Sequence, residues 1–161
     1  MVEVYVGIGS NVDPEHNTAL GIELLRQHSR DLKASRVYRG PAIGVCGDDF
    51  VNAVVQFQWH QGLADLVELV ASIHRQAGRS SKERATEGRT LDLDIELFGQ
   101  AVDGANRLPR QDVLAYDFVL APLAELAPQL PHPLLGSTMD ALWAPRAAGT
   151  VLRCLGDYVQ P

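Results

Sequence analysis

Residues 89–98 read Arg89-Thr-Leu-Asp-Leu-Asp-Ile-Glu-Leu-Phe98, and this stretch decides the fold. Apolar and acidic residues alternate strictly along it, with Leu91, Leu93, Ile95 and Leu97 predicted on one face and Asp92, Asp94 and Glu96 on the other. This period is typical of a half-buried β-strand. Because aspartate is poorly suited to strands, the acidic face indicates that the strand carries a function.

The acidic face predicts a site for a divalent cation. Asp92 and Asp94 are same-face neighbours, roughly 7 Å apart at their Cα atoms because a strand rises about 3.3 Å per residue. Mg²⁺ prefers hard oxygen ligands and is usually held by one or two carboxylates together with substrate phosphates. Arg89 stands three residues before Asp92, where it can pair with phosphate charge. The pattern favours metal-assisted phosphate chemistry, and a solvated strand face is the alternative.

Composition fits one globular domain, which we predict to span residues 1–161. Apolar residues make up 46% of the chain and charged residues 21%, which is ordinary for a soluble fold of this size. The net charge of −6 argues against general binding to nucleic acid or to an anionic membrane. Cationic residues nevertheless gather just before the acidic strand, at Arg75, Arg79, Lys82, Arg84 and Arg89.

Targeting and redox signals are sparse. Cys46 and Cys154 show neither metal-ligand spacing nor a disulfide framework. The first residues are strand-like, without a basic region followed by an apolar stretch, so we expect no signal peptide. No apolar run approaches the roughly 20 residues that span a bilayer. These features predict a cytoplasmic protein, and we expect it to be a monomer.

The hydrophobic pattern predicts an α+β fold. Strands are expected over 2–8, 32–39, 50–59 and the acidic segment, and helices over 14–29 and 63–77. Asp13-Pro14 predicts an N-cap before the first helix, and Ser137–Asp140 resembles the start of another. The order strand–helix–strand–strand–helix–strand is the ferredoxin-like split βαβ pattern. It predicts an antiparallel sheet with helices packed on one face.

Six segments, taken in order, resemble one known family. They are Tyr5-Val-Gly-Ile-Gly-Ser-Asn11, Val37-Tyr-Arg-Gly-Pro41, Phe50-Val-Asn-Ala-Val54, Gly78-Arg79, Arg89–Ile95 and Phe118–Pro128. The Gly-Ser-Asn run is weak alone, whereas Arg-Thr-Leu-Asp-Leu-Asp-Ile is specific, and the ordered set is stronger than any member. On these segments the chain resembles the 6-hydroxymethyl-7,8-dihydropterin pyrophosphokinase family of folate biosynthesis.

The resemblance implies an ATP-dependent pyrophosphokinase. Such an enzyme moves the β,γ-pyrophosphoryl group of ATP to the hydroxymethyl oxygen of the dihydropterin, with two Mg²⁺ ions. By position, Asp92 and Asp94 would hold both metals, and Arg79 and Arg89 match the catalytic arginines. The implied pterin-binding residues are Asn52, Phe118, Phe50, Gly40 and Pro41. For each phenylalanine the alternative is core packing.

The chain departs from the family pattern around the nucleotide. Pro109-Arg110 stands where the family usually has Pro-His, and Tyr116 replaces an arginine that clasps phosphate. His74 aligns with a nucleotide-contacting glutamate, so Arg110 and His74 are the nucleotide contacts we predict. Thr86-Glu87-Gly88 replaces an apolar-Gly-Pro run.

These departures leave a second hypothesis open, a paralogue that binds a pterin or nucleotide without turnover. A third is an interaction domain with no small-molecule site, because fold alone does not fix function. The retained acidic pair favours the enzyme. The polar segment between Gly78 and Gly88 predicts a mobile lid that closes over the nucleotide.

Overall fold

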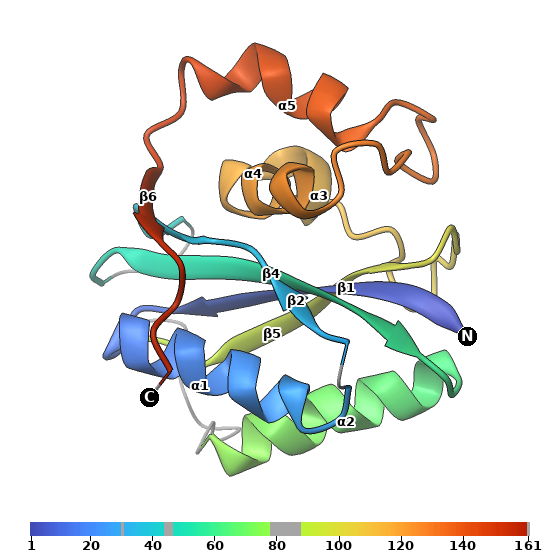
Figure 1. Ribbon diagram of the computed structural model, residues 1–161, viewed down its shortest axis with the longest axis horizontal. Coiled ribbons are helices and arrows are strands. Elements are labelled where there is room, and N and C mark those ends of the chain that lie inside the picture. The colour runs from blue at the N-terminus through green and yellow to red at the C-terminus, as the bar shows by residue number, and fades with distance from the viewer. Residues whose placement is uncertain (30, 44–46, 78–87, 161) are drawn as a thin grey trace.

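The computed structural model describes residues 1–29, 31–43, 47–77 and 88–160 (Figure 1). Its strands are β1 (Val2–Ser10), β2 (Lys33–Ala34), β3 (Val37–Gly40), β4 (Phe50–Trp59), β5 (Asp92–Phe98) and β6 (Arg153–Gly156). Its helices are α1 (Pro14–Arg26), α2 (Leu63–Gln76), α3 (Asp112–Ala115), α4 (Asp117–Leu126) and α5 (Met139–Ala147). No helix among these residues is long and apolar enough to cross a membrane.

All strands join one antiparallel sheet in the order β5-β1-β4-β3-β6, with β2 also pairing with β4. This order confirms the predicted α+β class and the split βαβ connectivity. The strand predicted over 32–39 is interrupted between β2 and β3. Ser35 causes the interruption, because its hydroxyl accepts the amide of Val54 at 3.0 Å and replaces part of the ladder.

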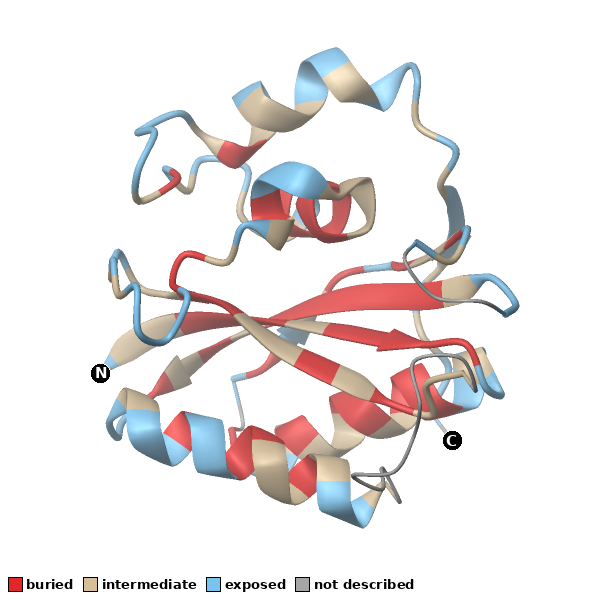
Figure 2. Ribbon diagram, turned by 180° about the vertical axis from the view of Figure 1, so that it is seen from behind, coloured by how far each residue is buried: buried red, intermediate tan, exposed pale blue. Residues whose placement is uncertain are grey.

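Helices cover both faces of the sheet, which corrects the prediction that they lie on one face (Figure 1). The first two helices pack on one face, where the core includes Val4, Val6, Ile22, Leu66 and Ile73. The opposite face also carries apolar side chains, and α3, α4 and α5 bury them in a second core around Tyr5, Val54, Leu97, Leu120 and Leu123. The sheet is therefore buried between two helical layers, as its colouring in Figure 2 shows.

Helix α1 begins at Pro14 as predicted, but Asp13 does not cap it with its side chain. The backbone of Asp13 is left-handed, with φ 41°, and the side-chain amide of Asn17 donates to the carbonyl of Val12 at 2.5 Å. Helix α5 begins at Met139, near the predicted start.

A β-bulge interrupts the alternation of the acidic strand. Tyr5 pairs with Leu97 and Val6 pairs with Ile95, so Glu96 has no partner across the ladder. The extra residue turns Leu97 into the second core, whereas Leu93 stays in the first. The prediction that Leu97 shares a face with Leu91, Leu93 and Ile95 is therefore wrong, because a bulge shifts the side-chain period by one residue.

Two glycines of β1 make room for polar side chains on the α4 side of the sheet. A Cβ at Gly7 would lie 2.6 Å from Oε1 of Glu96, and a Cβ at Gly9 would lie 2.9 Å from Oδ1 of Asn52. Glu96 is 2% exposed and Asn52 6%, so neither side chain has much space to move away. Because Gly7 and Gly9 have no side chains, they leave the space that the side chains of Glu96 and Asn52 occupy.

Gly7→Ala should therefore lower the free energy of unfolding by about 1–3 kcal/mol, the usual cost of overpacking a buried site. Because the clash is with Glu96, adding Glu96→Ala should cost less than the sum of the two single variants. Denaturant unfolding measures both effects, and Gly104→Ala is the matched control because no atom of the described residues lies within 4 Å of a Cβ there. Strict additivity of Gly7→Ala and Glu96→Ala would contradict this packing.

His132 is a buried titratable group in the connection between α4 and α5. It is 1% exposed, its Nδ1 accepts the amide of Leu134 at 3.2 Å, and its Nε2 has no hydrogen-bond partner among the described residues. Burial lowers the pKa of His132 below the ordinary value of 6.5, because the charged ring would lose its hydration.

The folded protein should therefore lose stability as the pH falls below 6.5, because the unfolded chain then binds a proton that folded His132 resists. His132→Asn keeps an acceptor for the Leu134 amide and should flatten this dependence in thermal unfolding series. His16→Asn removes an exposed histidine and should leave the dependence unchanged. An identical pH profile for wild type and His132→Asn would contradict the assignment.

Candidate functional site

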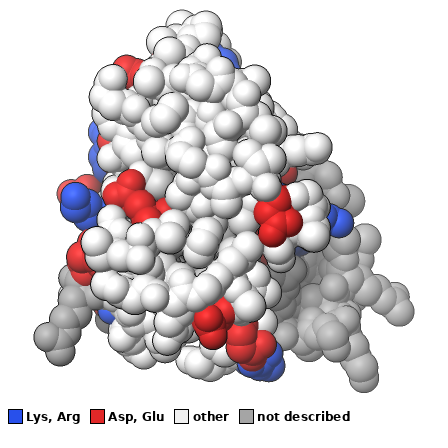
Figure 3. Space-filling view, turned by 90° about the vertical axis from the view of Figure 1, so that its right-hand side faces the viewer, with Lys and Arg blue, Asp and Glu red and all other residues white. Residues whose placement is uncertain are grey.

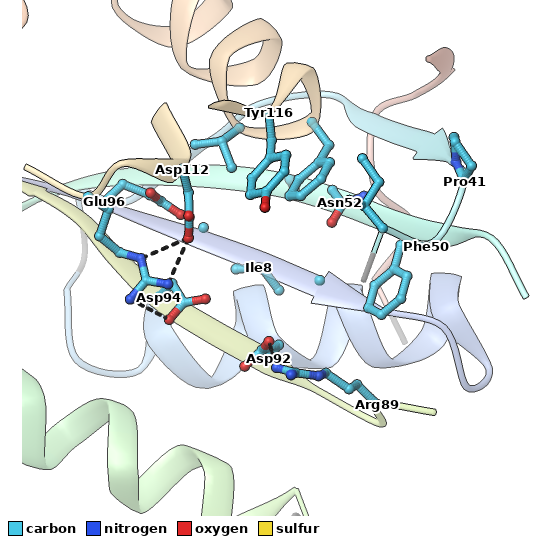
Figure 4. Close-up of a pocket in the computed structure, with 17 residues that line it drawn as sticks. Ile8, Pro41, Phe50, Asn52, Arg89, Asp92, Asp94, Glu96, Asp112 and Tyr116 are labelled. Carbon is cyan, nitrogen blue, oxygen red and sulfur yellow. Dashed lines mark hydrogen bonds and ion pairs between the residues drawn. The ribbon is translucent and has the colours of Figure 1, made fainter. Parts of the chain in front are cut away.

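A cavity of about 260 Å³ opens between the sheet and the start of α4 (Figure 4). Strands β1, β4 and β5 form its floor, and the segment 110–119 forms the opposite wall. Its lining residues are Gly7, Ile8, Gly9, Pro41, Ile43, Phe50, Asn52, Ala53, Arg89, Asp92, Asp94, Glu96, Arg110, Asp112, Tyr116, Phe118 and Val119. The small β1 glycines leave this space open beneath the wall.

The acidic residues of β5 line one side of the cavity. Asp92 pairs in register with Gly9, and Asp94 with Gly7. Their side chains are 20% and 37% exposed, so both carboxylates can be reached from solvent. Each also pairs with an arginine, Asp92 with Arg89 and Asp94 with Arg110 (Figure 4).

Arg89 is positioned by the end of β1. The amide of Arg89 donates to Oδ1 of Asn11 at 2.6 Å, and the amide of Asn11 donates to the carbonyl of Arg89 at 3.1 Å. The hydroxyl of Ser10 also donates to that carbonyl, at 3.2 Å. Gly88 has φ +85°, where a Cβ would lie 2.9 Å from Val12. The Gly-Ser-Asn run therefore acts as a clamp that fixes the backbone of Arg89.

Arg110 is held by three different partners. Its Nε and Nη2 donate to Oδ2 of Asp112 at 3.0 and 2.7 Å, and its Nη1 lies 3.3 Å from Oδ1 of Asp94. Its backbone amide donates to the carbonyl of Glu96 at 3.0 Å. These contacts join β5 to the start of α3 and leave the guanidinium in the cavity lining.

Glu96 and Asp112 belong to the site although the sequence analysis did not include them among its candidates. Burial raises the pKa of Glu96 well above its ordinary range, and the neighbouring Asp94 raises it further. Within the part of the chain that the structure describes, its Oε2 is buried without a hydrogen-bond partner. Spacing offered a signal for both residues, because Glu96 follows Asp94 at i+2 and Asp112 follows Arg110 at i+2.

The other end of the cavity is aromatic and amide-lined. Phe118 stacks on Tyr116, with ring centroids 4.9 Å apart and 9° between the planes. Asn52 and Phe50 come from β4, and Pro41 follows β3 (Figure 4). The structure thus gathers four of the five residues predicted for the pterin around one opening.

Two predicted residues lie elsewhere. Gly40 is outside the lining, and a Cβ there would lie 2.5 Å from Leu152 of the C-terminal segment. His74 is also outside the lining, and its Nε2 accepts the amide of Leu93 at 2.8 Å, between the two aspartates. Arg79 and the lid predicted over 78–88 fall outside the described residues, except for Gly88.

The donor set fits Mg²⁺ that is shared with a substrate. Within residues 1–29, 31–43, 47–77 and 88–160, no group of three or more His, Cys, Asp or Glu side chains is arranged to hold a metal ion. Two reachable carboxylates on one strand match the way in which Mg²⁺ is bound with substrate phosphates rather than by a complete protein cage.

Charge elsewhere is dispersed. On the face drawn in Figure 3, Asp and Glu form separate groups and the described Lys and Arg lie mainly toward the edges. That face therefore offers no continuous basic surface among the described residues, whereas the cavity places Arg89 and Arg110 beside acidic partners.

Known proteins match this chain over most of its length. The family model described as 7,8-dihydro-6-hydroxymethylpterin-pyrophosphokinase (HPPK) matches residues 5–128. A 2-amino-4-hydroxy-6-hydroxymethyldihydropteridine pyrophosphokinase of Pseudomonas aeruginosa is 33% identical over 136 residues, covering 81% of this chain and 83% of its own. The enzyme of the same name from Methylorubrum extorquens is 35% identical over 136 residues, covering 81% and 85%.

A solved structure supports the same fold. The Plasmodium falciparum HPPK-DHPS crystal structure with pterin and p-hydroxybenzoate superposes with a TM-score of 0.69 at 12% identity, covering 92% of this chain and 43% of that one. The family model and the relatives carry the assignment. This chain belongs to the 7,8-dihydro-6-hydroxymethylpterin-pyrophosphokinase family.

Proposed function

We propose that this chain transfers pyrophosphate from ATP to the hydroxymethyl group of 6-hydroxymethyl-7,8-dihydropterin, as an ATP-dependent diphosphotransferase. One observation carries the proposal: in a chain of this family, a single cavity brings Asp92 and Asp94 together with Asn52 and the Tyr116–Phe118 stack. In the reaction, the hydroxymethyl oxygen forms a bond to the β-phosphorus, the bond from that phosphorus to the bridging α–β oxygen breaks, and AMP leaves.

The aromatic end suits the flat acceptor. Phe118 offers a ring face for stacking, and Asn52 offers amide donors and an acceptor for the polar edge of a pterin. Gly9 keeps the Asn52 amide at the cavity floor because a side chain there would displace it. Tyr116 backs the Phe118 ring and holds it parallel. These residues would orient the hydroxymethyl group toward β5.

The acidic end suits the triphosphate with its metal. We propose that Asp92 and Asp94 are the protein ligands of Mg²⁺, with two ions expected. When bound, Mg²⁺ supplies neutralisation of phosphate charge and alignment of the attacking and leaving oxygens. Arg89 and Arg110 lie beside these carboxylates and would place positive charge on the transferred group.

We further expect the protein to act as a monomer in the cytoplasm, without nucleic acid. The alternative is a paralogue that binds a pterin or nucleotide without turnover, and it would give Asp92 and Asp94 no catalytic role. No contact among the described residues favours that alternative, and the curated relatives named above are pyrophosphokinases.

Asp92→Asn and Asp94→Asn should each reduce turnover on the order of a hundredfold or more, because each removes a charged ligand of the metal. The fold should survive, since both side chains are partly exposed. Asp157→Asn changes an exposed aspartate near the C-terminus and is the matched control. Wild-type turnover and Mg²⁺ dependence in both variants would contradict the metal assignment.

Arg110→Ala should weaken binding of an ATP analogue in the presence of Mg²⁺ by roughly ten- to a hundredfold, because one charge-assisted hydrogen bond is worth about 1.5–3 kcal/mol. Tyr116 cannot replace it, since a phenol lacks the fixed cationic fork of arginine. Binding of a pterin analogue should stay nearly constant. Isothermal titration separates the two ligands, and a loss confined to the pterin would reverse the proposed division of the site.

A further inference from the structure

We propose that Arg110 is a built-in counter-ion of Asp94, which weakens the binding of a divalent cation until nucleotide phosphates draw the guanidinium away. The inference rests on the proposed role of Asp94 as a metal ligand. It adds a second task to Arg110, in which the same side chain opposes the metal alone and supports the metal–nucleotide complex. Metal and nucleotide binding would then be coupled through one residue.

The geometry places the guanidinium where it competes directly for a carboxylate oxygen. Nη1 of Arg110 lies 3.3 Å from Oδ1 of Asp94, within the range of an ion pair (Figure 4). A cation that is bound through that oxygen must share it with Arg110 or displace Nη1. The side chains of Arg110 and Asp94 are 27% and 37% exposed, so solvent moderates this pair without abolishing it.

Asp112 prevents Arg110 from simply swinging into solvent. Two nitrogens of the guanidinium donate to the same oxygen, Oδ2 of Asp112, at 3.0 and 2.7 Å. The Arg110 backbone is also tied to β5, because its amide donates to the carbonyl of Glu96. An arginine that is held at both ends keeps its charge beside Asp94, so an approaching cation meets a fixed positive charge.

A bound triphosphate would change the balance. The guanidinium is a rigid plane with five N–H donors, so it can pivot as one unit about its two bonds to Oδ2 of Asp112 and carry Nη1 from Asp94 to a phosphate oxygen. That move takes the Arg110 charge away from Oδ1 of Asp94, so that the metal would no longer compete with Arg110 for this oxygen. Phosphate binding would therefore raise metal affinity, and by linkage the metal would raise nucleotide affinity by the same factor.

The test measures Mn²⁺ binding to the nucleotide-free protein by electron paramagnetic resonance, for wild type and Arg110→Met. We expect Arg110→Met to bind Mn²⁺ about three- to tenfold more tightly, because a nearby positive charge is gone. The same variant should bind a Mn²⁺–ATP analogue complex more weakly than wild type does. Opposite signs in one variant are the signature of a counter-ion that becomes a phosphate ligand.

Three further variants test whether the change in Mn²⁺ affinity depends on the charge of Arg110 and on Asp94. Arg107→Met removes a charge from an exposed residue outside the cavity lining and should leave Mn²⁺ affinity nearly unchanged. Arg110→Lys keeps the charge and should keep Mn²⁺ affinity low. In an Asp94→Asn background, Arg110→Met should no longer tighten Mn²⁺ binding, because the shared oxygen has lost its charge.

Failure of this proposal differs from failure of the proposed function. If Arg110→Met weakens nucleotide binding but binds Mn²⁺ no more tightly than wild type does, the counter-ion role is overturned and the phosphate role stands. An equal gain in Arg107→Met would overturn it too, since the effect would be one of overall charge. If Asp94→Asn binds Mn²⁺ with nucleotide as wild type does, the metal assignment itself fails.

Discussion

The antiparallel pairing of β1 with β5 is the constraint on which the rest of the structure depends. Its register sets Asp92 opposite Gly9 and Asp94 opposite Gly7, so each carboxylate lies beside a residue without a side chain. The same two glycines leave space for Asn52 and Glu96. Because β1 pairs with both the acidic strand and β4, the acidic end and the aromatic end of the cavity are fixed relative to each other.

The site combines rigid positions with electrostatic balance. Ser10 and Asn11 hold Arg89 through its backbone, and its side chain forms an ion pair with Asp92. Arg110 is held through its backbone amide by Glu96 and also through its side chain, between Asp94 and Asp112. Each arginine thus neutralises one aspartate. Like charges on neighbouring carboxylates would otherwise repel, and a metal with a triphosphate can take over that neutralisation.

Much of the first half of the fold could be predicted from the sequence. The hydrophobic pattern gave β1, β4, β5, α1 and α2, because apolar residues in these segments recur as they do in a strand or in a helix. Helix α4 could not be recognised in this way. It is apolar nearly all round and contains Pro122, and it forms because the second core encloses it. Because α4 was not predicted, helices were expected to cover only one face of the sheet.

The site also contains residues that could be predicted from their spacing in the sequence and contacts that could not. Asp92 and Asp94 were predictable as neighbours because their spacing places them on one face of a strand, and Arg89 because it lies three residues before Asp92. The contact between Arg110 and Asp94 joins positions far apart in the sequence, and it depends on the chain returning to β5 before α3. The burial of Glu96 depends on a bulge that alternation alone does not reveal. The stacking of Tyr116 on Phe118 depends on the extended backbone of Tyr116, which separates α3 from α4.

The most direct measurement of the central claim is mass detection of products after incubation with ATP, Mg²⁺ and 6-hydroxymethyl-7,8-dihydropterin. Transfer of the β,γ-pyrophosphoryl group predicts AMP and a pyrophosphorylated pterin in equal amounts, with the former β-phosphorus bonded to the hydroxymethyl oxygen. Formation of ADP with a monophosphorylated pterin would contradict the account. An amount of AMP no greater than that in a reaction without protein would contradict it too.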